Sequence, residues 1–145
     1  MEISDCIARL TSKDAAGAWA CTEQIAAESR ESGRWAPYLT DFAALLSHKN
    51  SLVRNRAISI LAANARWADK GQFDPLLEEF LRHVTDEKPI TARQCIHALP
   101  EIGLAQPHLA PRIRQVLAHA DLSGYRDSMR PLILKDIMDA LEQLP

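Results

Sequence analysis

Three prolines stand at nearly equal intervals along this chain, and each opens an apolar segment. Pro37, Pro75 and Pro111 are separated by 38 and 36 residues. Apolar side chains then follow at the i, i+3, i+4, i+7 spacing of a helix that buries one face. They are Leu39, Phe42, Ala43 and Leu46, then Leu77, Phe80, Leu81 and Val84, then Ile113, Val116, Leu117 and Ala120, and a fourth set lies 36 residues upstream at Ile3, Cys6, Ile7 and Leu10. A period of this length is typical of helical solenoids.

A second helical segment follows each of these after a short polar break. Residues 51–65, SLVRNRAISILAANA, form the clearest copy. Glycines at 33, 71 and 103 are expected to end the second helices of the first three pairs. Pro100 should bend or loosen its helix, and Pro131 should start or kink the last one. We therefore predict one all-α domain over residues 1–145, an α-α superhelix of about four antiparallel helix pairs.

Charge and cysteine content limit the classes of function. The chain has 17 Lys and Arg against 19 Asp and Glu, a balance that does not favour binding DNA or an anionic membrane through bulk charge. The acidic start, MEISDCIARL, differs from a signal peptide, and no run of about 18 apolar residues suggests a membrane span. Three cysteines at irregular spacing fit neither a disulfide framework nor a zinc site. We expect a cytoplasmic protein.

The second-helix motifs resemble those of the HEAT-repeat family, all-α solenoids built from stacked antiparallel helix pairs. Residues 53–57, Val-Arg-Asn-Arg-Ala, are similar to the family's second-helix pattern of valine, a basic residue, two free positions and alanine. Residues 98–103, Ala-Leu-Pro-Glu-Ile-Gly, are similar to its helix-ending Ala-Leu-Gly-Glu-Ile-Gly. The third pair departs from the pattern with Ala92 at the basic position, and the fourth matches only in apolar spacing.

The resemblance implies a scaffold or adaptor, because that is the usual role in this family. The chain is also similar to small bacterial HEAT-repeat proteins, some of which are labelled SufBD-like. In the family, the basic residue equivalent to Arg54 joins a ladder of contacts between neighbouring repeats, so we expect a structural role for Arg54. A few relatives are DNA alkylation-repair glycosylases or bilin lyases, which keeps nucleic-acid binding or DNA repair as an alternative function.

In such a stack the second helices line the concave surface, and the repeat register places candidate binding residues there. One row is Trp19, Asn55 and Arg93, its neighbour is Ala20, Arg56, Gln94 and Arg130, and a third is Glu23, Ser59 and His97. Arginine suits carboxylate or phosphate recognition, and tryptophan offers an apolar platform. We therefore predict that Trp19, Asn55, Arg56, Arg93, Gln94, His97 and Arg130 bind an acidic or phosphorylated segment of a protein partner.

Two competing interpretations remain for this surface. The arginines could instead be neutralised by nearby acids such as Asp127 and Glu101, leaving a solvated helix face. Alternatively, the exposed end repeats could stack between chains, so self-association is possible. The five histidines and three cysteines form no metal-ligand or nucleophile motif, so we predict no catalytic residue, no metal and no cofactor.

Overall fold

We describe residues 1–69 and 71–145 of a computed structural model, and these residues form eight α-helices and no β-strand. The α-helices are α1 Ile3–Leu10, α2 Ala15–Glu31, α3 Leu39–Ala44, α4 Ser51–Asn64, α5 Asp74–Leu81, α6 Pro89–Ala105, α7 Ala110–Ala118 and α8 Arg130–Gln143. Short 3-10 helices adjoin them: η1 Ala36–Tyr38, η2 Leu45–Ser47, η3 Ala65–Trp67, η4 Arg82–Thr85 and η5 Pro107–Leu109. The predicted all-α class is confirmed.

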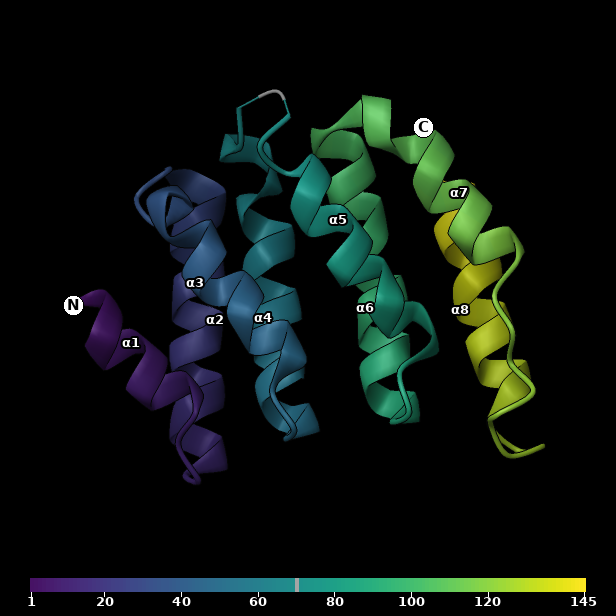
Figure 1. The fold of residues 1–145 in the computed structure, drawn as a ribbon, viewed down its shortest axis with the longest axis horizontal. Helices are drawn as coiled ribbons and strands as arrows, with labels where there is room; N and C mark the ends of the chain where they lie inside the picture. Colours follow the sequence, from purple (N-terminus) through teal and green to yellow (C-terminus); the bar gives the residue numbers. More distant parts are fainter. Residues whose placement is uncertain (70) are drawn as a thin grey trace.

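The helices lie in two layers that follow the order of the chain (Figure 1). We call α1, α3, α5 and α7 the first helices and α2, α4, α6 and α8 the second helices. Each second helix contacts the next one, from α2 to α4, α6 and α8. Polar contacts also join neighbouring pairs, as when Asn64 Nδ2 donates to Ser29 Oγ at 3.0 Å. Equivalent positions about 35 residues apart in sequence, separated by one helix pair, are therefore brought together.

Local sequence signals explain where most helices begin. Asp14 and Asn50 cap α2 and α4, since their side-chain oxygens accept from the backbone N–H groups of Gly17 and Leu52. Pro75, Pro89 and Pro131 lie in the first turns of α5, α6 and α8, where a missing N–H donor costs nothing.

Helix α6 differs from the expectation at Gly103. The helix contains Pro100, where the sequence predicts a bend or a loosening, and it continues past this proline. Gly103 lies inside α6 and does not terminate it, and a Cβ atom there would come within 2.5 Å of Leu144 Cδ2. Gly103 therefore lets the Leu144 side chain pack closely against α6. Gly71 has a positive φ of 92°, but it does not end α4 as predicted, because α4 ends at Asn64 and η3 at Trp67.

One hydrophobic core runs between the two layers. Phe42 and Phe80, at equivalent positions of the first helices, are both fully buried. Trp35 and Phe73 in the links between pairs are also buried, so these two side chains anchor the links to the core. Over the part of the chain that the structure describes, no helix is both long enough and apolar enough to cross a bilayer.

Candidate functional site: the outer surface of the second helices

The second helices expose the face that is turned away from the first helices, and we call this face the outer surface. On α6 it is marked by a stripe of exposed or half-buried residues at helical spacing: Ile90, Arg93, His97, Glu101 and Leu104. The equivalent stripe starts at Leu52 on α4, passes Ser59 and reaches Arg66 in η3. This is the surface on which the sequence placed the binding residues.

Two of the predicted binding residues are buried, which contradicts their assignment to an accessible surface. Arg56 is only 3% exposed, and its Nη1 donates to the carbonyl of Leu10 at 2.8 Å. Burial lowers the pKa of Arg56. Asn55 is 8% exposed, and its backbone carbonyl accepts from Gln94 Nε2. Both lie on α4, which is packed between α2 and α6. Through its bond to Leu10, Arg56 joins α4 to the end of α1, and it is not available to a ligand.

Three of the predicted residues do lie together on α6, but each is already held by a neighbouring helix. Gln94 Nε2 donates to Ser59 Oγ at 2.7 Å on α4. Arg93 Nε and His97 Nε2 both donate to the carboxylate of Asp136 on α8, at 2.6 and 2.9 Å. Burial alone would raise the pKa of Asp136, but the hydrogen bonds from Arg93 and His97 outweigh it and hold that pKa below the usual value. Arg93 is thus locally neutralised.

Arg130 does not belong to the row in which the sequence placed it. Its Nε donates to the carbonyl of Tyr125 at 2.9 Å, and its Nη2 pairs with Asp127 at 2.7 Å. The prolines that open α6 and α8, Pro89 and Pro131, are 42 residues apart, not 36. With this spacing Asp136 is the α8 counterpart of Gln94. Their contacts agree, because Gln94 bonds to α4 and Asp136 accepts hydrogen bonds from the equivalent positions of α6.

An apolar row on the outer surface was not predicted. Near its start, each of α4, α6 and α8 exposes one large apolar side chain: Leu52 at 49%, Ile90 at 70% and Leu132 at 43%. Leu52 and Ile90 are 38 residues apart, and Leu132 follows Ile90 by the same 42 residues as the two prolines. Trp19, a predicted site residue, is 41% exposed on α2, at the register of Asn55 and Arg93 and so about one turn further along its helix than the other three. We call Trp19, Leu52, Ile90 and Leu132 the apolar row. The repeat in the sequence already places Leu52 and Ile90 at equivalent positions, so most of this row could have been predicted from the sequence.

At the other end of the second helices an ionic cluster spans three helix pairs. Glu101 on α6 pairs with Arg66 after α4 at 2.9 Å and with Arg30 of α2 at 2.9 Å. An α2 side chain therefore reaches α6 across α4. The hydrogen bonds and charges of Arg30 and Arg66 outweigh the effect of burial and keep the pKa of Glu101 low.

Two adjoining cavities form a shallow groove along α6. One, of about 330 Å³, is lined by His97, Pro100, Asp136 and Asp139 among others, and faces α8. The other, of about 470 Å³, shares His97 and Pro100 and extends to Arg66 and Leu104. Acidic and basic groups alternate along this groove, so it presents no field of one sign to a partner.

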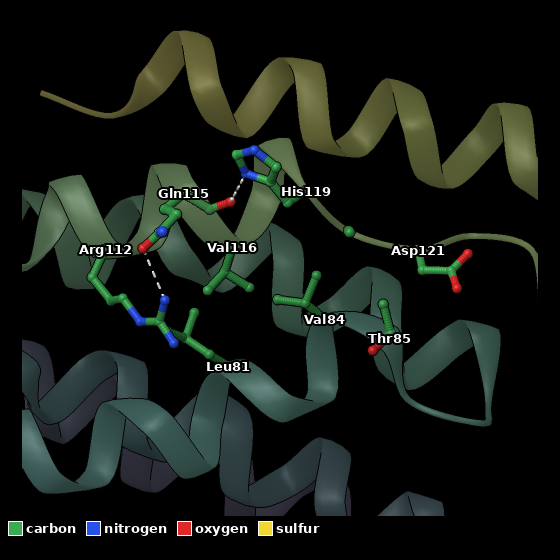
Figure 2. Close-up of a pocket in the computed structure, with 9 residues that line it drawn as sticks. Leu81, Val84, Thr85, Arg112, Gln115, Val116, His119 and Asp121 are labelled. Atoms are coloured by element: carbon green, nitrogen blue, oxygen red, sulfur yellow. Dashed lines mark hydrogen bonds between the residues drawn. The ribbon is translucent and has the colours of Figure 1, made fainter.

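A separate cavity of about 390 Å³ lies between α5 and α7, in the layer of first helices (Figure 2). Leu81, Val84 and Val116 provide its apolar wall, and Figure 2 shows Arg112 directed toward Gln115 at its edge. Arg112 is also paired with Glu78, at 2.7 Å. The cavity therefore has an apolar wall and an edge whose one arginine is already neutralised.

The remaining candidate residues have structural roles. Arg54 is 6% exposed and makes a two-bonded ion pair with Asp86 in the next helix pair, at 3.0 and 2.8 Å. This is the inter-pair contact that the HEAT resemblance implied. Cys6 and Cys95 are fully buried, and burial raises the pKa of the Cys6 thiol to about 12. Among the described residues no group of three or more His, Cys, Asp or Glu side chains could hold a metal.

Comparison with known proteins leaves the assignment to these observations. No family model, no curated protein and no solved structure matches this chain.

Proposed function

We propose that this chain is a HEAT-like solenoid that acts as a non-enzymatic protein-interaction module. Its partner segment would lie across the outer surface of the second helices. The observation that carries the proposal is the apolar row, because Trp19, Leu52, Ile90 and Leu132 expose large apolar side chains at the same end of four successive helices. Aligned exposed apolar groups mark interaction surfaces more strongly than scattered ones do.

The contacts favour an apolar-anchored segment over the acidic one inferred from the sequence. An acidic or phosphorylated segment would have to displace Asp136 from Arg93, and Asp127 from Arg130. Arg56 would have to leave the interior. No such displacement is needed at Leu52 and Ile90, which are simply exposed.

The geometry of the row also suggests the pattern of the partner. Packed helices lie roughly 8–10 Å apart, and an extended chain advances about 3.3 Å per residue. An extended segment crossing the second helices would therefore present an apolar side chain to the row at about every third residue.

Co-purification from the source cells tests this function. The test variant combines Leu52→Asp with Ile90→Asp, and the matched control combines Thr40→Asp with Ala44→Asp on α3, where both residues are exposed. We expect a bound protein that is retained by the wild type and the control and lost by the test variant. A peptide from that protein should then bind the wild-type chain directly, and more weakly when its apolar residues are replaced by alanine.

An unchanged set of bound proteins with the Leu52→Asp, Ile90→Asp variant would refute the proposed surface. Recovery of nucleic acid in place of a protein would favour the alternative function. Binding of that nucleic acid should then fall steeply with added salt.

A further inference from the structure

The side of α8 that faces away from α6 carries an uncovered apolar seam. Pro131, Leu134, Met138 and Leu141 follow one another at spacings of 3, 4 and 3 residues, which is the pattern of a helix that packs along another helix. Leu134 is 51% exposed and Met138 is 61% exposed, whereas Leu141 is half-buried. We call these four residues the α8 seam.

The equivalent side of α6 shows what such a seam does when it is covered. With the spacing of 42 residues set by Pro89 and Pro131, Leu134 and Met138 correspond to Ala92 and Ile96. Both α6 residues are 0% exposed, and α8 packs against that helix. The α8 seam is thus the side of a second helix that elsewhere in this molecule receives another helix.

Charges beside the seam are segregated along α8. Lys135 precedes Asp139 and Glu142, and all three are exposed or half-buried. Lys135 Nζ pairs with Asp139 on the same helix at 2.7 Å, but its side chain is still 74% exposed and can reach a second acid. If a second α8 packs antiparallel with its centre near Met138, Lys135 of one copy faces Glu142 of the other. A parallel arrangement would place like charges together. The counterpart of Lys135 on α6, Arg93, already forms such a contact with Asp136 of its neighbour at 2.6 Å.

The opposite end of the molecule fits the seam less well. The free side of α2 presents Gly17, Ala20, Gln24 and Glu31, all exposed and none a large apolar residue. Head-to-tail stacking would cover Leu134 and Met138 with small and polar groups. Packing α8 on α8 covers apolar side chains in both copies.

We propose that two copies of this chain associate through their α8 seams, antiparallel and related by a two-fold axis near Met138. A cavity of about 460 Å³ at the start of α8, lined by Leu122, Pro131 and Leu134 among others, receives an apolar side chain from the end of the second copy's α8. Helix α8 has 14 residues and is about 21 Å long. The contact is smaller than the roughly 800 Å² per partner of a standard interface, so we expect micromolar association.

Sedimentation equilibrium of the full chain, from micromolar to near-millimolar concentration, tests this pairing. We expect the wild type to pass from monomer to dimer and no further. Met138→Asp should remain a monomer over the whole range, while Leu104→Asp should dimerise like the wild type. Leu104 is 63% exposed on the outer surface of α6, so it controls for loss of an exposed apolar residue.

A charge exchange tests the antiparallel arrangement separately and does not depend on the seam variant folding. Lys135→Glu alone should weaken dimerisation about tenfold or more, and Lys135→Glu combined with Glu142→Lys should restore it. A wild-type chain that is monomeric throughout, or that forms assemblies larger than a dimer, would overturn the proposal. Failure of the double exchange to restore the dimer would overturn the antiparallel geometry. Circular dichroism checks the fold of each variant.

Discussion

Helices α4 and α8 have the same length of 14 residues and both belong to the layer of second helices, yet their surroundings differ. In α4 even the charged side chains of Arg54 and Arg56 are buried, at 6% and 3% exposure. In α8 the apolar side chains of Leu134 and Met138 are 51% and 61% exposed. The burial of a side chain therefore depends more on whether its helix lies inside or at the end of the layer of second helices than on the polarity of the residue.

The difference has a physical cause in the neighbours of each helix. Helix α4 lies between α2 and α6, and its arginines are tolerated because each finds an acceptor: the carboxylate of Asp86 for Arg54 and the carbonyl of Leu10 for Arg56. Helix α8 contacts α6 on one side and no second helix on the other within the described chain. Inside the layer of second helices, α4 is thus held by specific polar bonds. At the end of the layer, α8 leaves apolar side chains exposed.

The largest expected effect on stability is loss of the ion pair that holds Arg54 of α4, compared with loss of the ion pair that holds Arg130 of α8. Asp86→Ala leaves the Arg54 guanidinium buried without its partner and should lower the free energy of unfolding by about 3–5 kcal/mol. Asp127→Ala removes the partner of Arg130, but Asp127 is 94% exposed, so the loss should be below about 1 kcal/mol. Denaturant unfolding of the two variants measures both values. Equal losses would contradict the distinction between α4, inside the layer of second helices, and α8, at its end.

The next comparison is between a charged and an apolar side chain. We expect replacement of the buried arginine Arg56 to cost more stability than replacement of the exposed leucine Leu134. Arg56→Ala leaves the carbonyl of Leu10 without its donor and should cost about 1–3 kcal/mol. Leu134→Ala, at an exposed position of α8, should change stability by no more than about 0.5 kcal/mol. Both are measured by urea unfolding at a concentration low enough to keep the chain monomeric. A Leu134→Ala loss as large as that of Arg56→Ala would show that the free side of α8 is already covered in the single chain.

The sequence alone predicted the parts of the fold that depend on local patterns. The apolar spacing around Phe42 and Phe80 was enough to pair the helices, and the basic residue at 54 was correctly assigned to a contact between neighbours. The burial of Arg56 could not be predicted, because its acceptor is the carbonyl of Leu10, 46 residues away. No periodicity in the chain reveals that bond.

The register of the last helix was missed for a different reason. Residues 119–129, which connect α7 to α8, contain no helix, and this connection shifts the spacing from 36 to 42 residues. Arg130 was therefore assigned to a row that Asp136 occupies. The same shift concealed Leu132 as the continuation of Leu52 and Ile90. Aligning Pro131 with Pro89, instead of counting a constant period, would have corrected both assignments.

The smallest expected effect concerns the contact between α6 and α8 and depends on pH. Hydrogen bonds from Arg93 and His97 hold the pKa of Asp136 below its usual value of 3.8, against the opposing effect of burial. A carboxyl whose pKa is lower in the folded chain contributes stability that is complete above its unfolded pKa and disappears as the pH falls through its folded pKa. Asp136→Asn should therefore cost about 1 kcal/mol near pH 6, and this difference should shrink toward zero at pH values of about 3 and below.

Asp139→Asn is the matched control, because Asp139 lies on the same helix and is paired with Lys135, whose side chain is 74% exposed. Its effect should not exceed a few tenths of a kcal/mol, roughly the value of an exposed i, i+4 pair. Denaturant unfolding of both variants between about pH 3 and pH 6 distinguishes them. If the cost of Asp136→Asn does not fall as the pH is lowered, the ionised carboxylate of Asp136 does not hold α8 to α6. The contact between α6 and α8 would then depend on apolar packing alone.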